Sequence, residues 1–228
     1  AATTSVLLSG ENIDANSPTI SGVTIPNTAM KVSDVVTATI TVESDSDTLS
    51  LSAGSIGGFS LGNLSKINGT TYTATFTVTE GGTDVAAGSS IPLSVVLVDP
   101  AGNPSNTYTT AINQAGDTID ANSPTIFGVS VVNGTHGVSN TVAITITATD
   151  NETGLTLSSK TFNGQTLTDI TDNNNGTYSA TYTVVEGDTD VADGAAVNTN
   201  LAFTDGASNS GAATTSVLLS GENIDANS

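Results

Sequence analysis

The sequence predicts an all-β protein made of two β-sandwich domains that follow one another along the chain. Three observations lead to this prediction. Apolar and polar residues alternate over short segments, Gly, Asn and Asp cluster between these segments, and one acidic motif recurs about every hundred residues. In addition, residues 1–17 are identical to residues 212–228, so two divergent units form one larger repeat.

The recurring motif predicts where the domains join. It reads Glu-Asn-Ile-Asp-Ala-Asn-Ser at residues 11–17 and 222–228, and Asp-Thr-Ile-Asp-Ala-Asn-Ser at residues 117–123. The expected divisions are the last strand of a preceding domain at 1–12, a first domain at 13–118, a second domain at 119–223, and the start of the next joint at 224–228.

Strand-like segments supply the predicted sandwich. They lie at 18–25, 34–43, 48–52, 71–80, 91–99 and 106–112, and again at 124–132, 140–150, 154–159, 176–186, 196–205 and 213–219. Alternation is clearest at Val36, Ala38, Ile40 and Val42, which indicates a half-buried strand. About seven short strands per hundred residues, the first led by proline, favour an immunoglobulin-like (Ig-like) sandwich.

The charge balance excludes several classes of partner. Acidic residues number 22 against 3 lysines, and the formal net charge is −19. Binding to nucleic acid needs many basic side chains, and so does docking on an anionic membrane. No apolar run is long enough for direct membrane insertion, and the chain has no cysteine for disulfides or zinc–thiolate sites. The excess acid instead predicts a bound hard cation.

The sequence offers no catalytic set, so we expect neither an enzyme nor a small-molecule substrate. The one histidine, His136, lies in a predicted turn, and no nucleophile elbow or phosphate-binding loop is present. Paired carboxylates can hydrolyse glycosides, but aromatic residues make up only 4% of the chain. That content is too low for the platforms that bind sugars.

The Ig-like strand order predicts where the acids gather. The loop between the second and third strands and the loop between the last two strands lie at the N-terminal end of each domain. The loop before the penultimate strand lies at the C-terminal end. The middle joint is therefore expected to bind Ca²⁺ through Glu80, Asp84, Asp117, Asp120, Asn122, Asp150 and Asp205.

Partial Ca²⁺ sites are expected at the two outer joints. Their predicted ligands are Glu11, Asp14, Asn16, Asp45 and Asp99 at one end, and Glu186, Asp188, Asp190 and Asp225 at the other. Asp47 and Glu152 lie in the same kind of loop and are further candidates. The alternative is that these Asp and Asn residues cap their own turns.

Two resemblances make the prediction more specific. The joints ENIDANSP and DTIDANSP resemble the calcium-binding linkers of cadherins, although they lack the adjacent Asp-Asn-Asp run. Residues 175–190, NGTYSATYTVVEGDTD, and the segment Asp99-Pro-Ala-Gly-Asn103 resemble bacterial Ig-like repeats of giant calcium-dependent surface adhesins of the repeats-in-toxin type. Residues 68–84 and 205–209 fit these two patterns more loosely.

The resemblance implies an extracellular role at a bacterial cell surface. Such repeats are spacers that project a distal adhesion domain, and calcium stiffens their joints. The implied partners are neighbouring identical repeats of the same polypeptide, and the chain is expected to be monomeric. The alternative function is a calcium-dependent Ig-like module that binds a carbohydrate or a host surface.

Overall fold

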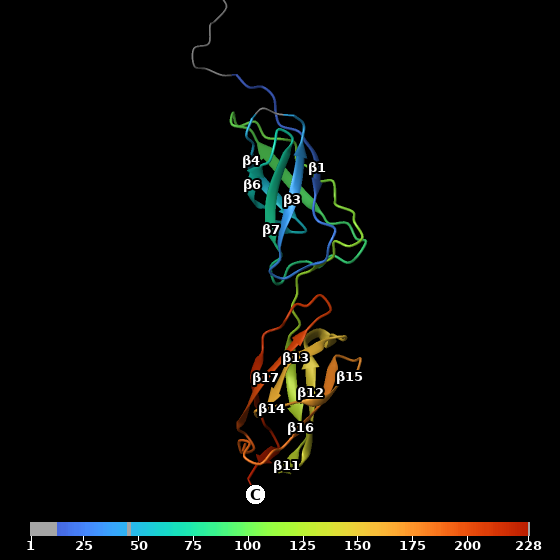
Figure 1. Cartoon of the computed structure of the whole chain (residues 1–228), viewed down its shortest axis with the longest axis vertical. Coiled ribbons are helices and arrows are strands. Elements are labelled where there is room, and N and C mark those ends of the chain that lie inside the picture. Colours follow the sequence, from blue (N-terminus) through green and yellow to red (C-terminus); the bar gives the residue numbers. More distant parts are fainter. Residues whose placement is uncertain (1–12, 45–46, 228) are drawn as a thin grey trace, which may run out of the picture. The chain divides into compact units, whose positions relative to one another are not determined.

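The computed structural model describes residues 13–44 and 47–227, and the chain divides into two compact units, Ala1–Ala121 and Asn122–Ser228 (Figure 1). We call them unit 1 and unit 2. Both are built of β-strands, and the 3-10 turn η1 (Thr149–Asn151) is the one helical element of the described residues. No helix in this part of the chain has the length and apolar character that a membrane span requires.

Unit 1 has two main sheets that share one hydrophobic core. The strand order is β1-β3-β7-β6 in one sheet and β5-β4-β8 in the other, and a short third sheet pairs β2 with β9. The strands are β1 (Ile20–Thr24), β2 (Met30–Lys31), β3 (Val35–Val42), β4 (Ser50–Ile56), β5 (Phe59–Ser60), β6 (Gly62–Lys66), β7 (Thr71–Thr77), β8 (Leu93–Val98) and β9 (Ile119–Asp120).

Unit 2 repeats this arrangement around a core of its own. Its sheets have the orders β10-β12-β16-β15 and β14-β13-β17-β18, with β11 paired to β19. The strands are β10 (Ile126–Val131), β11 (Gly134–Gly137), β12 (Thr141–Ala148), β13 (Thr156–Phe162), β14 (Gln165–Thr166), β15 (Thr168–Asp172), β16 (Thr177–Thr183), β17 (Ala196–Thr204), β18 (Thr214–Leu218) and β19 (Glu222–Asp225).

The strand order confirms the predicted all-β, Ig-like sandwich. In that fold the first, second, fifth and fourth main strands form one sheet, and the third, sixth and seventh form the other. β1, β3, β7 and β6 follow this order in unit 1, and β10, β12, β16 and β15 follow it in unit 2. The seventh strand is β18 in unit 2, whereas unit 1 has only isolated bridges at Tyr108 and Ile112.

The strands show the predicted alternation of buried and exposed residues, and their buried apolar side chains pack the two sheets together. In β3, Val36, Ala38, Ile40 and Val42 point into the core of unit 1, and the residues between them are exposed or half-buried. β7 and β12 show the same period of two. Because period 2 places every second side chain on one face, each strand presents one apolar face to the core.

The sequence did not predict two of the main strands, β6 and β15. The pairing of each with the next strand shifts register, between Gly62 and Ser65 and between Thr168 and Thr171. A bulge interrupts the alternation on which the prediction rested. The other unpredicted strands, β2, β5, β9, β11, β14 and β19, are two to four residues long and are too short for a periodic signal.

The acidic motif packs into the unit that it ends. In unit 1, β9 runs parallel to β2, and Val85 bridges Ile119. In unit 2, β19 runs parallel to β11, and Val191 bridges Ile224. The division therefore falls after Ala121, later than the expected boundary at 118, because the Ile and Ala of the motif fill the core. The strand expected at 1–12 lies outside the described residues.

One buried tyrosine in each unit fastens a loop at the N-terminal end. The Tyr72 hydroxyl accepts a hydrogen bond of 3.1 Å from the Leu49 N–H and donates one of 3.1 Å to the Asp47 carbonyl. The hydroxyl of Tyr178 makes the equivalent pair of hydrogen bonds in unit 2, with Leu155 and Glu152. The loop before the third main strand is thus held by a group inside the core.

We expect Tyr72→Phe to lower the free energy of unfolding of unit 1 by about 1–3 kcal/mol, because the buried Leu49 N–H loses its acceptor. Denaturant unfolding of the full chain measures the loss. Tyr108→Phe is the control, since Tyr108 is only partly buried and hydrogen-bonds Val95 through its backbone. An equal loss of stability in both variants would contradict the role of the Tyr72 hydroxyl.

Candidate metal centre

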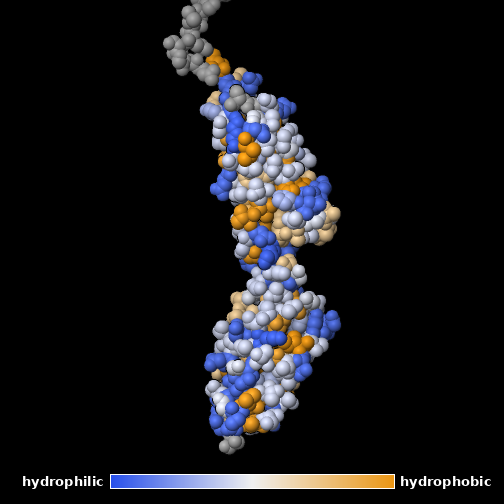
Figure 2. Space-filling view, in the orientation of Figure 1, coloured by the Kyte–Doolittle hydropathy of each residue, from blue (hydrophilic) through white to orange (hydrophobic). Residues whose placement is uncertain are grey.

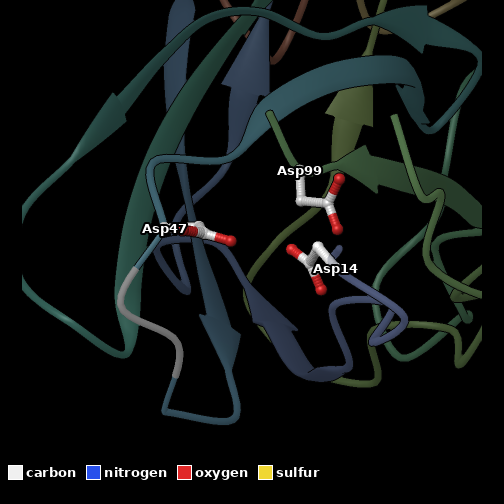
Figure 3. A group of neighbouring side chains, drawn as sticks. All are labelled: Asp14, Asp47 and Asp99. Atoms are coloured by element: carbon white, nitrogen blue, oxygen red, sulfur yellow. The ribbon is translucent and has the colours of Figure 1, made fainter. Parts of the chain in front are cut away.

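Three carboxylates from separate segments meet at the N-terminal end of unit 1 (Figure 3). Asp14 precedes β1, Asp47 lies between β3 and β4, and Asp99 follows β8. One oxygen of each lies within 4.8 Å of the others, and among residues 13–44 and 47–227 this is the one such group. Ca–O bonds of about 2.3–2.6 Å place two ligand oxygens at most about 5 Å apart, so one ion can reach all three.

Asn103 joins the parts of this site. Its side-chain NH₂ donates to Asp99 Oδ2 at 2.9 Å, to the Asp14 carbonyl at 3.2 Å and to the Asn16 carbonyl at 3.4 Å. Its backbone N–H donates to Asp99 Oδ1 at 2.8 Å. One side chain therefore fixes the loop after β8 to the segment that enters the unit. The sequence pattern of residues 99–103 predicts Asp99 as a ligand but gives no role to Asn103.

Opposing effects set the pKa of Asp99. Desolvation raises it, but hydrogen bonds from the side chain and backbone of Asn103 and from the backbone of Gly102 and Ala101 outweigh this effect. The pKa of Asp99 therefore lies below its ordinary value of 3.8. Asp99 is ionised at neutral pH and carries a full negative charge toward Asp14 and Asp47, which is the charge that a cation site needs.

Unit 2 repeats these hydrogen bonds at its own N-terminal end. The Asn209 N–H donates to Asp205 Oδ1 at 2.8 Å, and its side chain donates to Asp205 Oδ2 at 3.1 Å and, more weakly, to the Asn122 carbonyl at 3.5 Å. Asn209 is only 2% exposed. The equivalent Asn residues were missed as positioning residues, although the Asp-x-x-x-Asn spacing occurs in both units.

At the C-terminal ends, predicted ligands hold the acidic motif in place. Asp84 Oδ1 accepts a hydrogen bond of 2.7 Å from the Ala121 N–H. Asp190 Oδ1 accepts the equivalent bond of 2.7 Å from the Ala226 N–H, and its Oδ2 accepts one of 2.6 Å from the Asn227 side chain. A carboxylate has about four lone-pair positions, so these bonds leave capacity for a cation.

The other predicted ligands differ in exposure. Asp117 is buried, and its Oδ2 accepts a hydrogen bond of 3.3 Å from Gln114. Of the others, Glu80, Asp150, Glu186 and Asp225 are exposed, and Asp120 is half-buried. Glu11 and Asp45 lie outside the described residues.

Comparison with known proteins agrees with the strand order of unit 1. Residues 14–115 match the family model of the bacterial Ig-like domain. Over these residues the chain is similar to bacterial Ig-like domains. Domains of this family are typically non-catalytic parts of extracellular surface proteins. A search of curated proteins finds no match to the sequence.

A search of solved structures matches this chain at low overall similarity. The fibronectin(III)-like modules of Clostridium thermocellum CbhA are 17% identical, with a TM-score of 0.34 over 90% of this chain and 94% of that one. The D00–D0 domain of intimin is 13% identical, with a TM-score of 0.32 over 86% of this chain and 98% of that one. The titin I9–I11 tandem is 12% identical, with a TM-score of 0.29 over 92% of this chain and 66% of that one. No conclusion about function follows from likenesses at this level.

Unit 1 differs from unit 2 beside the loop that follows the fifth main strand. In unit 1 the rings of Phe59 and Phe76 stack with centroids 6.0 Å apart, and a Cβ at Gly82 would lie 2.6 Å from Phe59. Unit 2 has Gln165, Tyr182 and Asp188 at the equivalent positions. An apolar stack has thus been replaced by a polar network.

In that network the predicted ligand Asp188 accepts three hydrogen bonds. Its Oδ1 accepts a hydrogen bond from Gln165 at 2.6 Å, and its Oδ2 accepts from the Tyr182 hydroxyl at 2.8 Å and the Val185 N–H at 2.9 Å. Desolvation raises the pKa of Asp188, but these three bonds outweigh it and lower the pKa below 3.8. Burial and the bond to Asp188 raise the pKa of Tyr182 to about 12, so its hydroxyl remains a donor.

We expect Asp188→Asn to lower the free energy of unfolding of unit 2 by about 1–2 kcal/mol at pH 6, because a charged acceptor of three hydrogen bonds is lost. A carboxyl group whose pKa is lower in the folded state than in the unfolded state stabilises the fold at pH values above its unfolded-state pKa. This stabilisation disappears as the pH falls through the folded-state pKa. The difference from the wild type should therefore shrink below pH 3.8. Thermal unfolding between pH 2 and pH 6 measures this.

Glu186→Gln is the control for that experiment, because Glu186 is an exposed carboxylate in the same loop. A difference between Asp188→Asn and the wild type that stays constant down to pH 2 would show that the charge of Asp188 is unimportant.

Proposed function

We propose that the chain is a spacer from a bacterial cell-surface adhesin of the repeats-in-toxin type. Its tandem Ig-like units hold a distal adhesion domain away from the cell, and Ca²⁺ bound at the ends of the units stiffens their joints. The working partners are neighbouring repeats of the same polypeptide, and the chain acts as a monomer. The protein is extracellular, and the units carry no catalytic function.

The group of Asp14, Asp47 and Asp99 is the observation that supports this proposal most directly. Its ligands are oxygens from three segments, so a cation at this point would join the entering chain to two loops. Calcium accepts about 6–8 oxygens in loose geometry, whereas magnesium requires a stricter octahedron and retains more water. Carbonyl and amide oxygens of the same segments, with water, would complete such a shell.

Charge gives the second reason for a cation. Two carboxylates about 4 Å apart repel by about 4 kcal/mol at an effective dielectric constant of about 20. The chain has only 3 basic residues against 22 acidic ones, so it cannot neutralise its acidic ends by itself. A divalent ion reverses the sign of the interaction, and binding to the folded form alone would stabilise each unit.

Repetition favours a spacer over a single binding module. The hydrogen bonds of Asn103 in unit 1 recur at Asn209 in unit 2, and those of Asp84 recur at Asp190. Each added copy of such a unit lengthens the chain by one domain. Strands of about ten residues at about 3.3 Å per residue correspond to a length of about 35 Å for each unit.

The proposed ligands are those that the sequence predicts, with Asp47 added. The middle joint uses Glu80, Asp84, Asp117, Asp120, Asn122, Asp150 and Asp205. The outer sets use Asp14, Asn16, Asp47 and Asp99, with Glu11 and Asp45, at one end, and Glu186, Asp188, Asp190 and Asp225 at the other.

The alternative, a module for carbohydrate or a host surface, lacks a suitable platform. Of the nine aromatic residues, all of which are described, only Phe127 is largely exposed, at 80% in β10. On the face visible in Figure 2, hydrophobic residues form small patches among polar ones. Calcium-dependent binding of the full chain on a glycan array would nevertheless favour this alternative.

We expect calorimetric titration of the full chain to detect Ca²⁺ binding, and Asp99→Asn to weaken binding at its site at least tenfold, because the site loses its buried charged ligand. Saturation at about 100 times Kd should raise the free energy of unfolding by about 2.7 kcal/mol. Asp169→Asn, an exposed acid in β15, is the control and should change neither quantity. The absence of both binding heat and a shift in Tm would falsify the calcium proposal.

Small-angle scattering tests the joint itself. We expect the full chain in excess Ca²⁺ to have a narrower distribution of intramolecular distances than the same chain in EDTA, because a bound ion restricts the motion of one unit against the other. Asp205→Asn should remove the difference, and Asp169→Asn should leave it intact. Superimposable profiles in Ca²⁺ and EDTA for the wild type would contradict a stiffened joint.

A further inference from the structure

One tripeptide closes the same hairpin in both units. Asn68-Gly69-Thr70 lies between β6 and β7, and Asn175-Gly176-Thr177 lies between β15 and β16, of which Thr177 is the first residue. The preceding strands differ, since β6 reads GNLSK and β15 reads TDITD. Asn-x-Thr in an exposed loop is the pattern at which a sugar is attached to the Asn amide. Both asparagines are exposed.

The threonine fixes the asparagine side chain in the same way in both hairpins. Asn68 Oδ1 accepts hydrogen bonds from the Thr70 N–H at 2.9 Å and from the Thr70 hydroxyl at 3.1 Å. Asn175 Oδ1 accepts the equivalent bonds from Thr177 at 3.0 Å and 2.7 Å. Two donors on one carboxamide oxygen draw electron density from the amide. The Nδ2 nitrogen therefore loses a proton more readily when it forms a new bond.

The fold uses only the oxygen of these two side chains. No described residue accepts a hydrogen bond from Nδ2 of Asn68 or Asn175. An aspartate makes the same turn contact nearby, because Asp172 Oδ1 accepts a hydrogen bond of 2.8 Å from the Asn174 N–H. The turn thus requires an oxygen acceptor and not an NH₂ group. In both hairpins the NH₂ group is left for a reaction at the surface.

The other copies of the Asn-x-Ser/Thr pattern lack this arrangement. They begin at Asn63, Asn133 and Asn151. Asn63 Nδ2 already donates a hydrogen bond of 2.9 Å to the Thr75 hydroxyl. Asn133 Nδ2 lies 3.1 Å from the position of a Cβ on Gly221, and Asn151 Cβ lies 2.6 Å from the position of a Cβ on Gly176, so both side chains are crowded. Only two of the five copies combine an exposed NH₂ group with a threonine bound to the oxygen.

We propose that Asn68 and Asn175 are glycosylation sites that accept a sugar from an activated sugar phosphate. Nδ2 forms a bond to C1 of the sugar, and the bond between C1 and the phosphate oxygen breaks. The phosphate leaves with the electron pair of that bond, and the Nδ2 proton passes to a base of a separate asparagine glycosyltransferase. Oδ1 keeps its two hydrogen bonds, so the hairpin tolerates the modification.

Mass spectrometry of the full chain tests this proposal. The chain is expressed in cells that lack N-glycosylation and is then the acceptor in two reactions. One contains a soluble asparagine glycosyltransferase with UDP-glucose, and the other contains membranes with an oligosaccharyltransferase and a lipid-linked oligosaccharide. We expect at least one reaction to modify Asn68 and Asn175 about tenfold faster than the other three copies. The reaction that succeeds identifies the donor, and incubation without transferase is the control.

Variants of the first hairpin separate the acceptor from the turn. Thr70→Val should slow modification of Asn68 at least tenfold and leave Asn175 unchanged, because only the first hairpin loses its hydroxyl. Thr70→Ser should restore the reaction. Asn68→Asp should remove modification at this position without lowering the Tm of unit 1, because the oxygen acceptor is retained.

Three results would overturn the proposal. Neither reaction adds sugar to Asn68 or Asn175, all five copies react at the same rate, or Thr70→Val leaves the rate at Asn68 unchanged. None of these results depends on bound Ca²⁺, so the test is independent of the calcium proposal.

Discussion

The burial of the Ile-Asp-Ala segment of the acidic motif is the interaction on which the rest of the structure depends. Ile119 and Ala121 complete the core of unit 1 through the pairing of β9 with β2, and Ile224 and Ala226 complete unit 2 through β19 and β11. The motif is therefore a closing element of one domain as well as a linker to the next. Its acidic residues lie at the end of each unit because its apolar residues are anchored in the core.

The two units show how one backbone accommodates different chemistry. In unit 1 the stacked rings of Phe59 and Phe76 require a glycine at position 82. In unit 2 the equivalent place holds Asp188 and Tyr182, and every buried side-chain nitrogen and oxygen of the described residues has a hydrogen-bond partner. A core replacement of this kind is tolerated when each buried polar group that it introduces is paired.

The candidate site could be predicted in part. The Ig-like loop order correctly placed Asp99 with Asp14 at the N-terminal end and Asp84 beside the motif at the C-terminal end. Asp47 was one of several acids in its loop, and only the bond between its carbonyl and Tyr72 shows how that loop is held. The role of Asn103 depends on carbonyls that lie more than eighty residues away in sequence, which no local pattern records.

The sequence by itself determined the all-β class, the repeat period and the end of each unit at which the acids gather. These follow from period-2 alternation, turn residues and recurrence, which are local properties of the chain. The tertiary structure decided where the motif packs, that bulged β6 and β15 belong to the sheets, and that Asp188 is occupied by hydrogen bonds. It also decided that Ile13 and Ile224, in identical sequence, have different environments, because burial depends on the partner surface that is present.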